Sequence, residues 1–276
     1  MFKILEKKTL AKGVIQMTIE APLIALKARP GQFIVLIVDE QGERIPLTLA
    51  DWDKDLGTIS IIFQQLGFTT RQLGSLAPGG SIVHILGPLG HPTDIKDLGE
   101  VYCIAGGVGI AELYPVARAF KEARNRVTGI LGARTKELVI LEPQMQKACD
   151  ELFIATDDGS YGKKGFVTDS LKDLFEVIEK STHTKYPALV YTIGPVAMMK
   201  AVAEMTREAK IKTIASVNPI MVDATGMCGA CRCTVAGKTV FGCCDGPDFD
   251  AHTLDFDELS SRLEGEKGDV SIYPAA

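Results

Sequence analysis

Residues 101–134, VYCIAGGVGIAELYPVARAFKEARNRVTGILGAR, decide the fold of the central part of this chain. An apolar, β-branched run ends in glycines, a segment with helical spacing follows, and a second apolar run completes the unit. The same alternation of apolar runs and helical segments continues to about residue 211. Such alternation is typical of a parallel sheet whose two faces are covered by helices. The sequence therefore predicts an α/β domain over residues 98–212.

The residues on either side of this domain follow different patterns. Up to Pro92, short β-branched or alternating runs such as GVIQMTIEAP are bounded by Gly or Pro, which predicts an antiparallel β-barrel over residues 1–97. Residues 213–276 contain most of the cysteines and end in the short amphipathic segment LDFDELSSRLEGE. A length of 276 residues accommodates more than one core. We expect a barrel, an α/β domain and a small C-terminal domain.

The composition excludes several classes of function. The net charge of −5 and the lack of a long Lys/Arg run argue against binding to nucleic acid or to an anionic membrane. No stretch approaches the roughly 20 apolar residues of a membrane span, and the first residues do not resemble a signal peptide. We therefore expect a cytoplasmic protein. In that reducing compartment the seven cysteines are better explained as metal or redox groups than as disulfides.

Two strand-to-helix junctions carry glycines where an anionic ligand could bind. Gly106, Gly107 and Gly109 precede a helix that begins near Ile110, and a Gly-Pro pair at 194–195 precedes another. In an open α/β sheet both junctions lie at the carboxyl edge, where backbone amides and helix dipoles favour phosphate. The strict G-x-G-x-x-G spacing is absent, so a tight turn without a ligand is the alternative at each junction.

The barrel region contains two further motifs, ERIPLTLAD at 43–51 and GFTTRQLGSL at 67–76. Taken alone, each is compatible with a surface turn followed by a helix cap. Their order is more informative: R-x-P-L-T, G-x-T-T, G-G-V-G-I-A and then G-P-x-x-M-M resembles the ferredoxin-NADP reductase superfamily over residues 1 to about 212. The resemblance implies a barrel that binds FAD and an α/β domain that binds a nicotinamide nucleotide.

By this resemblance the flavin is held by Arg44, Pro46, Leu47, Thr48, Ile62, Phe63, Gln64, Thr69 and Thr70. The nucleotide is held by Gly106, Gly107, Val108, Gly109, Ile110, Ala111, Arg134, Asp157, Asp158, Gly159, Gly194 and Pro195. The family places its arginine three residues before the Ser or Thr, where this chain has Ile45. A shift of one residue in a regular strand turns Arg44 to the other face.

Residues 221–246, MVDATGMCGACRCTVAGKTVFGCCDG, contain five cysteines. Asp223, Cys228, Cys231 and Cys243 form the pattern D-x4-C-x2-C-x11-C, which is the plant-type iron–sulfur spacing with Asp in the first position. Zinc would accept the same spacing, and Asp223 could instead be a capping or solvated carboxylate. Cys244, next to Cys243, competes for the last position. The spacing alone leaves these alternatives open.

The segments NPIMVDATGMCGACRCTV and FGCCDGPDFDAHTLDFDEL narrow the resemblance. They resemble the small subunits of NADH-dependent reduced ferredoxin:NADP oxidoreductase and of sulfide dehydrogenase, which are related to the electron-transfer subunit of dihydroorotate dehydrogenase. This implies a [2Fe-2S] cluster held by Asp223, Cys228, Cys231 and Cys243. It also implies a heterodimer with a larger flavin and iron–sulfur subunit that performs electron bifurcation and connects the chain indirectly to ferredoxin.

The resemblance favours NAD(H) as the nicotinamide substrate. Arg134 and Lys136 follow the second strand of the α/β domain, where positive charge could accept the 2′-phosphate of NADP(H). Because hydride transfer to or from a flavin needs positioning and not an acid or base side chain, we expect no catalytic residue, and in particular no catalytic His or Asp. A zinc-stabilised nucleotide-binding module is the alternative from another class.

Overall fold

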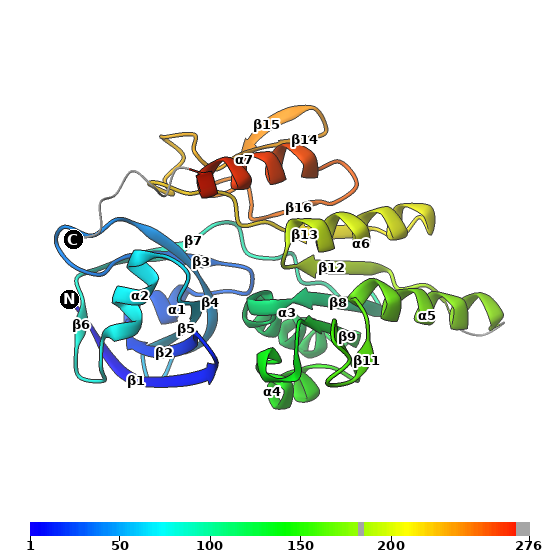
Figure 1. Cartoon of the computed structure of the whole chain (residues 1–276), viewed down its shortest axis with the longest axis horizontal. Coiled ribbons are helices and arrows are strands. Elements are labelled where there is room, and N and C mark those ends of the chain that lie inside the picture. The colour runs from blue at the N-terminus through cyan, green and yellow to red at the C-terminus, as the bar shows by residue number, and fades with distance from the viewer. Residues whose placement is uncertain (182–184, 269–276) are drawn as a thin grey trace.

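The computed structural model describes residues 1–181 and 185–268, and residues 269–276, the end of the expected third domain, lie outside the described part. In the described part of the chain, two seven-stranded sheets lie side by side, and a two-stranded hairpin with a helix covers one side of them (Figure 1). Within the described residues, none of the helices combines the length and the apolar character that a membrane crossing requires.

The first sheet has the order β6-β1-β2-β5-β4-β3-β7, with antiparallel neighbours. β6 and β7 stand at opposite ends of this order, yet only Val83 separates them in the chain, so the sheet curls into a nearly closed barrel. The predicted barrel is confirmed. Its elements are β1 (Phe2–Ala11), β2 (Val14–Glu20), α1 (Pro22–Lys27), β3 (Phe33–Ile37), β4 (Ile45–Asp53), β5 (Thr58–Gln64), α2 (Phe68–Ser75), β6 (Ser81–Ile82) and β7 (His84–Leu89).

The barrel is held by apolar side chains that alternate along its strands. Met17 of β2 pairs with Ile61 of β5, and Ile19 pairs with Ile59; all four side chains are fully buried. Alternate residues of a strand point to the same face, so these pairs stack inside the barrel. Burial of each such side chain contributes about 1.5–3 kcal/mol. The alternation seen in the sequence therefore corresponds to the inner face of the barrel.

The second sheet has the order β11-β10-β9-β8-β12-β13-β16 and is parallel except for β16. The predicted α/β architecture is confirmed. Its strands are β8 (Glu100–Gly106), β9 (Arg126–Ala133), β10 (Glu151–Thr156), β11 (Lys163–Lys164), β12 (Leu189–Ile193), β13 (Thr213–Ser216) and β16 (Asp248–Asp250). β16 comes from the C-terminal segment but completes the edge of this sheet. The division into residues 1–97, 98–212 and 213–276 stays a prediction.

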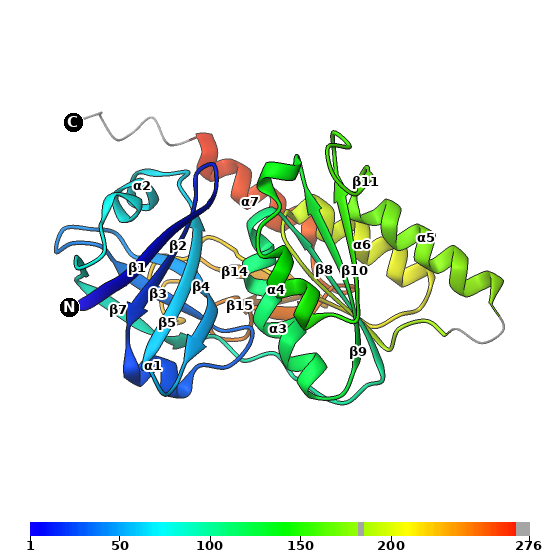
Figure 2. The same cartoon turned by 90° about the horizontal axis from the view of Figure 1, so that it is seen from below.

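Helices cover both faces of this sheet (Figure 2). Successive residues of β8 point to opposite faces of the sheet. Cys103 belongs to the core with α3 and α4, whereas Tyr102 and Ile104 belong to the core with α5 and α6. The helices are α3 (Ile110–Glu122), α4 (Glu142–Ala148), α5 (Val167–Lys180) and α6 (Val196–Glu208), with 3-10 turns at η1 (Gly107–Gly109) and η2 (Lys136–Leu138). α3 also contacts β4 and so joins the sheet to the barrel.

The C-terminal segment touches both larger parts. β14 (Arg232–Val235) and β15 (Lys238–Phe241) form the hairpin, and α7 (Phe256–Gly268) follows. Cys233, Phe256 and Leu259 pack with residues of α6. The other C-terminal cysteines lie in residues 217–231, before β14, and in residues 242–247, after β15; these two stretches together are called the cysteine loop. They pack on the barrel, in a cluster of Phe33, Val35, Met221, Ala224, Cys231 and Cys243. The segment is therefore fixed at two places.

A carboxylate links the three parts of the chain. Tyr191 of β12 donates a hydrogen bond to Oδ1 of Asp248 at 2.8 Å, and Thr93, in the connection after the barrel, donates to Oδ2 at 2.6 Å. Burial raises the pKa of Asp248, while the hydrogen bonds from its neighbours oppose this shift. Gly31 leaves room for this arrangement, because a Cβ at that position would stand 2.2 Å from Oγ1 of Thr93.

We expect the Asp248→Ala substitution to lower the free energy of unfolding by about 2–4 kcal/mol, because two hydroxyl groups then lose their acceptor. Asp248→Asn keeps an acceptor and removes the desolvated charge, so we expect less than about half of that loss. Urea denaturation at pH 7 measures both values. An alanine variant that is as stable as the asparagine variant would contradict this role of the carboxylate.

Candidate functional site

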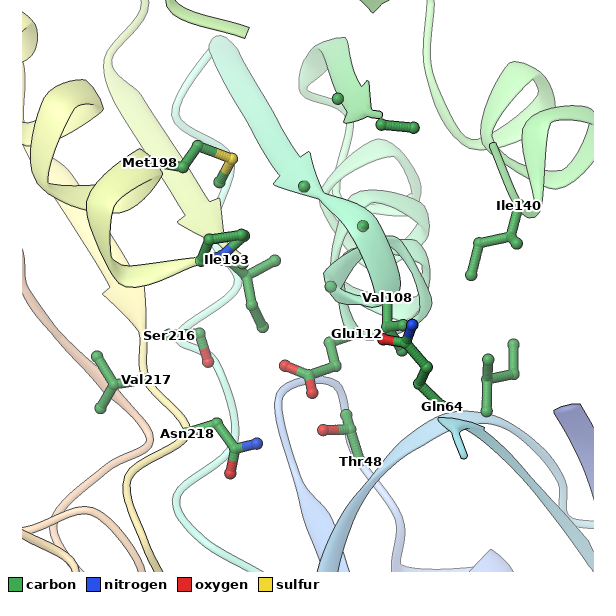
Figure 3. A pocket seen from close by; sticks show the side chains of 18 of the residues that line it. Thr48, Gln64, Val108, Glu112, Ile140, Ile193, Met198, Ser216, Val217 and Asn218 are labelled. Carbon is green, nitrogen blue, oxygen red and sulfur yellow. The ribbon is translucent and has the colours of Figure 1, made fainter. Parts of the chain in front are cut away.

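A cavity of about 890 Å³ lies between the barrel and the carboxyl edge of the parallel sheet. This volume falls in the range of small-molecule and cofactor sites. The barrel contributes residues of β4 and β5, and the sheet contributes the ends of β8, β9, β12 and β13. Figure 3 shows side chains from both parts, among them Thr48, Gln64, Ile193 and Ser216, around the same space.

Most of the residues predicted to hold a flavin line this cavity. Thr69 and Arg44 do not. Thr69 is buried, and its hydroxyl donates a hydrogen bond to Glu43. Arg44 is exposed and directs Nη1 to the backbone carbonyl of Asp223 at 3.4 Å. The lining residues from the predicted set are Pro46, Leu47, Thr48, Ile62, Phe63, Gln64 and Thr70.

The start of β4 explains the position of Arg44. β4 begins at Ile45, which pairs with Leu36 of β3, so Arg44 stands just before the strand. Its side chain reaches toward the cysteine-bearing loop, and the cavity is lined from Pro46 onward. Arg44 stands one residue before the position of the family's arginine, and its guanidinium lies outside the cavity wall.

The predicted nucleotide residues divide in a similar way. Ile110 and Ala111 are buried within the first turn of α3. Asp158 accepts hydrogen bonds from the backbone N–H and the hydroxyl of Ser160, which lowers its pKa, and Gly159 lies in the same turn outside the cavity wall. The predicted residues that line the cavity are Gly106, Gly107, Val108, Gly109, Arg134, Asp157, Gly194 and Pro195.

The two glycine junctions approach each other closely. A Cβ on Gly194, which has φ +146°, would lie 2.9 Å from the backbone nitrogen of Gly106. A Cβ on Gly109 would lie 2.9 Å from the carbonyl oxygen of Ile193. Glycine therefore lets the ends of β8 and β12 form one continuous wall beside the N-terminus of α3. Backbone amides at such a helix terminus favour a bound phosphate.

Glu112 was not among the residues predicted from the sequence. Its carboxyl group extends from the first turn of α3 into the cavity, beside Thr48, with Ser216 and Asn218 nearby (Figure 3). Burial raises the pKa of Glu112 to about 7; the hydrogen bond from Thr48 opposes the shift, and the charge of Asp248 adds to it. The sequence held one signal for this residue: Glu112 is an acidic side chain within the otherwise largely apolar run GIAELYP at the start of the helix.

The predicted metal ligands lie on the loop before β14 and the turn after β15. Cys231 and Cys243 are buried, whereas Cys228 and Cys244 are exposed. The backbone N–H of Cys243 donates to Sγ of Cys231 at 3.4 Å, and the N–H of Ala230 donates to Sγ of Cys228 at 3.5 Å. Burial raises the pKa of the Cys243 thiol, and the adjacent sulfurs of Cys231 and Cys244 raise it further.

Asp223 is held by the backbone of the same loop. Its Oδ1 accepts from the N–H of Thr225 at 2.8 Å and its Oδ2 accepts from the N–H of Cys228 at 3.1 Å. The backbone hydrogen bond from Thr225 is the main cause of a lowered pKa for Asp223. These two hydrogen bonds hold the turn between Asp223 and Cys228.

The donor set fits an iron–sulfur cluster in its chemistry. Within residues 1–181 and 185–268, no three His, Cys, Asp or Glu side chains already stand together as a metal site. Yet Cys228, Cys231 and Cys243 share one region, and two of their sulfurs receive backbone N–H groups, the kind of contact that tunes iron–sulfur ligands. Gly226 and Gly229, with φ of +84° and +68°, let the loop turn tightly around this region.

The cysteine loop and the cavity share side chains. Phe33 and Met221 line the cavity and also belong to the apolar cluster that contains Cys231 and Cys243. Pro247, which follows Cys243 and Cys244 in the chain, lines the cavity as well. The cysteine loop therefore lies next to the cavity.

Comparison with known proteins gives two family matches. Residues 218–255 match the model of the iron–sulfur cluster binding domain of dihydroorotate dehydrogenase B. Residues 103–204 match the model of the oxidoreductase NAD-binding domain. The first match covers the cysteine loop, and the second covers the glycine junctions of β8 and β12.

Similar proteins span nearly the whole chain. A *Thermotoga maritima* homolog of the dihydroorotate dehydrogenase B (NAD+) electron transfer subunit is 44% identical over 261 residues, 95% of this chain and 90% of that protein. An uncharacterized *Clostridium beijerinckii* protein is 45% identical over 269 residues, 95% of this chain and 89% of its own length.

A solved structure of NADH-dependent reduced ferredoxin-NADP oxidoreductase, described for flavin-based electron bifurcation, has a TM-score of 0.89 with 42% identity. The match covers 98% of this chain and 96% of the solved one. The *Amycolatopsis* cytochrome P450 reductase GcoB shares the fold alone, with a TM-score of 0.62 and 21% identity over 76% of this chain and 66% of that one.

We expect Gly194→Ala to lower the free energy of unfolding by about 2–4 kcal/mol, because the added methyl group meets the backbone of Gly106 at a strained φ. Gly13→Ala is the matched control: its φ is +72°, but nothing lies within 4 Å of the added Cβ. The control should lose about 1 kcal/mol. Equal losses of unfolding free energy in the two variants, measured by urea denaturation, would show that the close approach of the two glycine junctions does not limit the residue at position 194.

Proposed function

We propose a function from the premise that this chain belongs to the family of dihydroorotate dehydrogenase B electron-transfer subunits and their homologues. The chain is a flavoprotein oxidoreductase subunit that exchanges electrons between a nicotinamide nucleotide and a partner protein. The observation that carries this function is the shared cavity: the barrel motif, the two glycine junctions and the cysteine loop all border one space. A flavin and a nicotinamide bound there would be in contact, with an iron–sulfur cluster beside them.

FAD fits the barrel side of the cavity. Pro46, Leu47 and Thr48 would face the isoalloxazine, and Thr70 at the start of α2 would face the pyrophosphate. Bound FAD accepts a hydride from a nicotinamide and releases electrons singly, which is the chemistry that links NAD(H) to a cluster. The chain contributes by orienting the two rings and by surrounding them with mainly apolar side chains that exclude water.

NAD(H) fits the sheet side. Gly106 to Gly109 and the N-terminus of α3 would bind the pyrophosphate, and Gly194-Pro195 would place the nicotinamide toward the flavin. Arg134 and Asp157 line the cavity, whereas the Lys136 ammonium lies over the ring of Tyr161, 5.2 Å from its centre. Asp157 brings a negative charge to the same cavity wall as Arg134, and this charge disfavours a 2′-phosphate, which supports NAD(H) over NADP(H).

A [2Fe-2S] cluster fits the cysteine loop, with Asp223, Cys228, Cys231 and Cys243 as ligands. Cys243 is favoured over Cys244 because its side chain is buried beside Cys231, whereas Cys244 is exposed. Asp223 would exchange backbone hydrogen bonds for a bond to iron. The family match of residues 218–255 supports an iron–sulfur cluster over the zinc alternative.

The proposed assembly is a heterodimer with a larger flavin and iron–sulfur subunit, as in an electron-bifurcating NADH-dependent ferredoxin:NADP oxidoreductase. The similarity to such a structure over 98% of this chain supports this choice. Small subunits of sulfide dehydrogenase and electron-transfer subunits of dihydroorotate dehydrogenase are the alternatives. In this proposal residues 1–97 bind FAD, residues 98–212 bind the nucleotide, residues 213–276 bind the cluster, and the complex is cytoplasmic.

The cofactor assignment predicts about one flavin, two irons and two acid-labile sulfides per chain after anaerobic purification. We expect Cys231→Ala to lose the iron. Asp223→Cys should keep the iron and change the midpoint potential of the cluster, because a thiolate replaces a carboxylate. Cys149→Ala, in the core of the α/β domain, is the control that should retain the iron. Zinc in place of iron, or a full cluster in Cys231→Ala, would contradict the assignment.

The nucleotide assignment predicts that NADH reduces the flavin at least about tenfold more efficiently than NADPH, equivalent to about 1.4 kcal/mol. Asp157→Asn should narrow this preference, because it removes the negative charge that would oppose a 2′-phosphate. Stopped-flow measurement of flavin bleaching with each nucleotide gives the ratio. A wild-type preference for NADPH would overturn the choice of NAD(H).

A further inference from the structure

We propose that Glu112 is the proton-exchanging residue of the cavity: its carboxylate accepts the proton that the reduced flavin gives up when its electrons leave singly. This inference rests on the proposed function and extends it. Hydride transfer from a nicotinamide needs no acid or base, but the departure of electrons toward an iron–sulfur cluster leaves a proton behind. In a cavity with mainly apolar walls, that proton needs an acceptor from the protein.

The position of Glu112 suits this role. α3 packs against β4 of the barrel, and this contact carries the carboxyl group of its first turn across to Thr48, within the motif proposed to face the flavin ring. Figure 3 shows Glu112 and Thr48 side by side in the cavity, with Ser216 and Asn218 on the opposite side. Thr48 and the two polar side chains offer hydrogen-bonding groups through which a proton could be exchanged with the cavity.

The charges around Glu112 allow it to hold or release a proton near neutral pH. The charged group that acts on it is Asp248 of β16, which is itself bonded to Tyr191 of β12 and to Thr93. Asp51 of β4 is instead engaged by Arg118, further along α3, at 2.9 Å. Burial and the like charge of Asp248 raise the pKa of Glu112 to about 7, and the Thr48 hydrogen bond restrains this rise.

The step balances in atoms and charge. Glu112 takes up one proton as an N–H bond of the reduced flavin breaks and an O–H bond forms at the carboxylate. Two electrons pass one at a time to the cluster and then to a one-electron acceptor on the partner, so the flavin is oxidised and the acceptor is reduced. In the reverse direction the protonated Glu112 returns the proton.

The pH dependence of the flavin midpoint potential tests this role in the full chain loaded with FAD and cluster. A reduced, negatively charged flavin would raise the pKa of a neighbouring carboxyl group further. Between about pH 7 and this higher pKa, reduction would take up an additional proton at Glu112, and the slope of potential against pH should roughly double there. Above the higher pKa, Glu112 stays ionised beside the reduced flavin and can accept its proton. We expect this break in the wild-type protein, no break in Glu112→Gln, and a break again in Glu112→Asp.

Half-reaction rates provide the second readout. Glu112→Gln should change flavin reduction by NADH by less than about twofold and slow oxidation by cytochrome c, a one-electron acceptor, by about tenfold or more. Glu122→Gln is the matched control, because it removes a carboxylate from the same helix at a side chain that is 72% exposed. The control should leave the break and both rates unchanged.

Three results would overturn the assignment. A break that persists in Glu112→Gln would show that another group exchanges the proton, and an equal slowing of both half-reactions would show that Glu112 only positions the ligands. Either result, with flavin still bound, contradicts the role of Glu112 alone. A wild-type chain that binds no flavin contradicts the proposed function and this inference together.

Discussion

The packing of the cysteine loop on β3 is the contact on which the electron-transfer function depends. Cys231 and Cys243 share an apolar cluster with Phe33 and Val35, and Phe33 also lines the cavity. Single electrons move between redox groups only over short distances, so a cluster on a detached C-terminal segment could not serve a flavin in the barrel. The two attachments of that segment, to β3 and to α6, keep the loop beside the cavity.

A second constraint is the junction of the barrel, the parallel sheet and the C-terminal strand at Asp248. β16 adds to the edge of the sheet, and its first residue binds Tyr191 and Thr93. Burial raises the pKa of Glu112 in the cavity, and the charge of the Asp248 carboxylate adds to that shift. A residue that joins the three parts therefore also influences the charge of the site that they enclose.

The sequence predicted those features that depend on local patterns. Alternation in β2 and β5 identified the barrel, and the glycine junctions near Gly106 and Gly194 identified the carboxyl edge of the α/β sheet. Features that depend on packing between distant segments were missed. Glu112 reaches the cavity only because α3 packs on β4, and β16 joins a sheet whose previous strand lies more than thirty residues earlier in the chain. The contact of Arg44 with the backbone of Asp223 joins residues 179 positions apart.

The central claim is that one chain carries electrons from a nicotinamide through a flavin to its own iron–sulfur cluster. Rapid-freeze electron paramagnetic resonance after mixing the anaerobic chain with NADH measures this directly, when repeated at several protein concentrations. The account predicts that the signal of the reduced cluster follows flavin reduction at a rate independent of protein concentration. A cluster that stays oxidised, or a rate that rises in proportion to protein concentration, would contradict it.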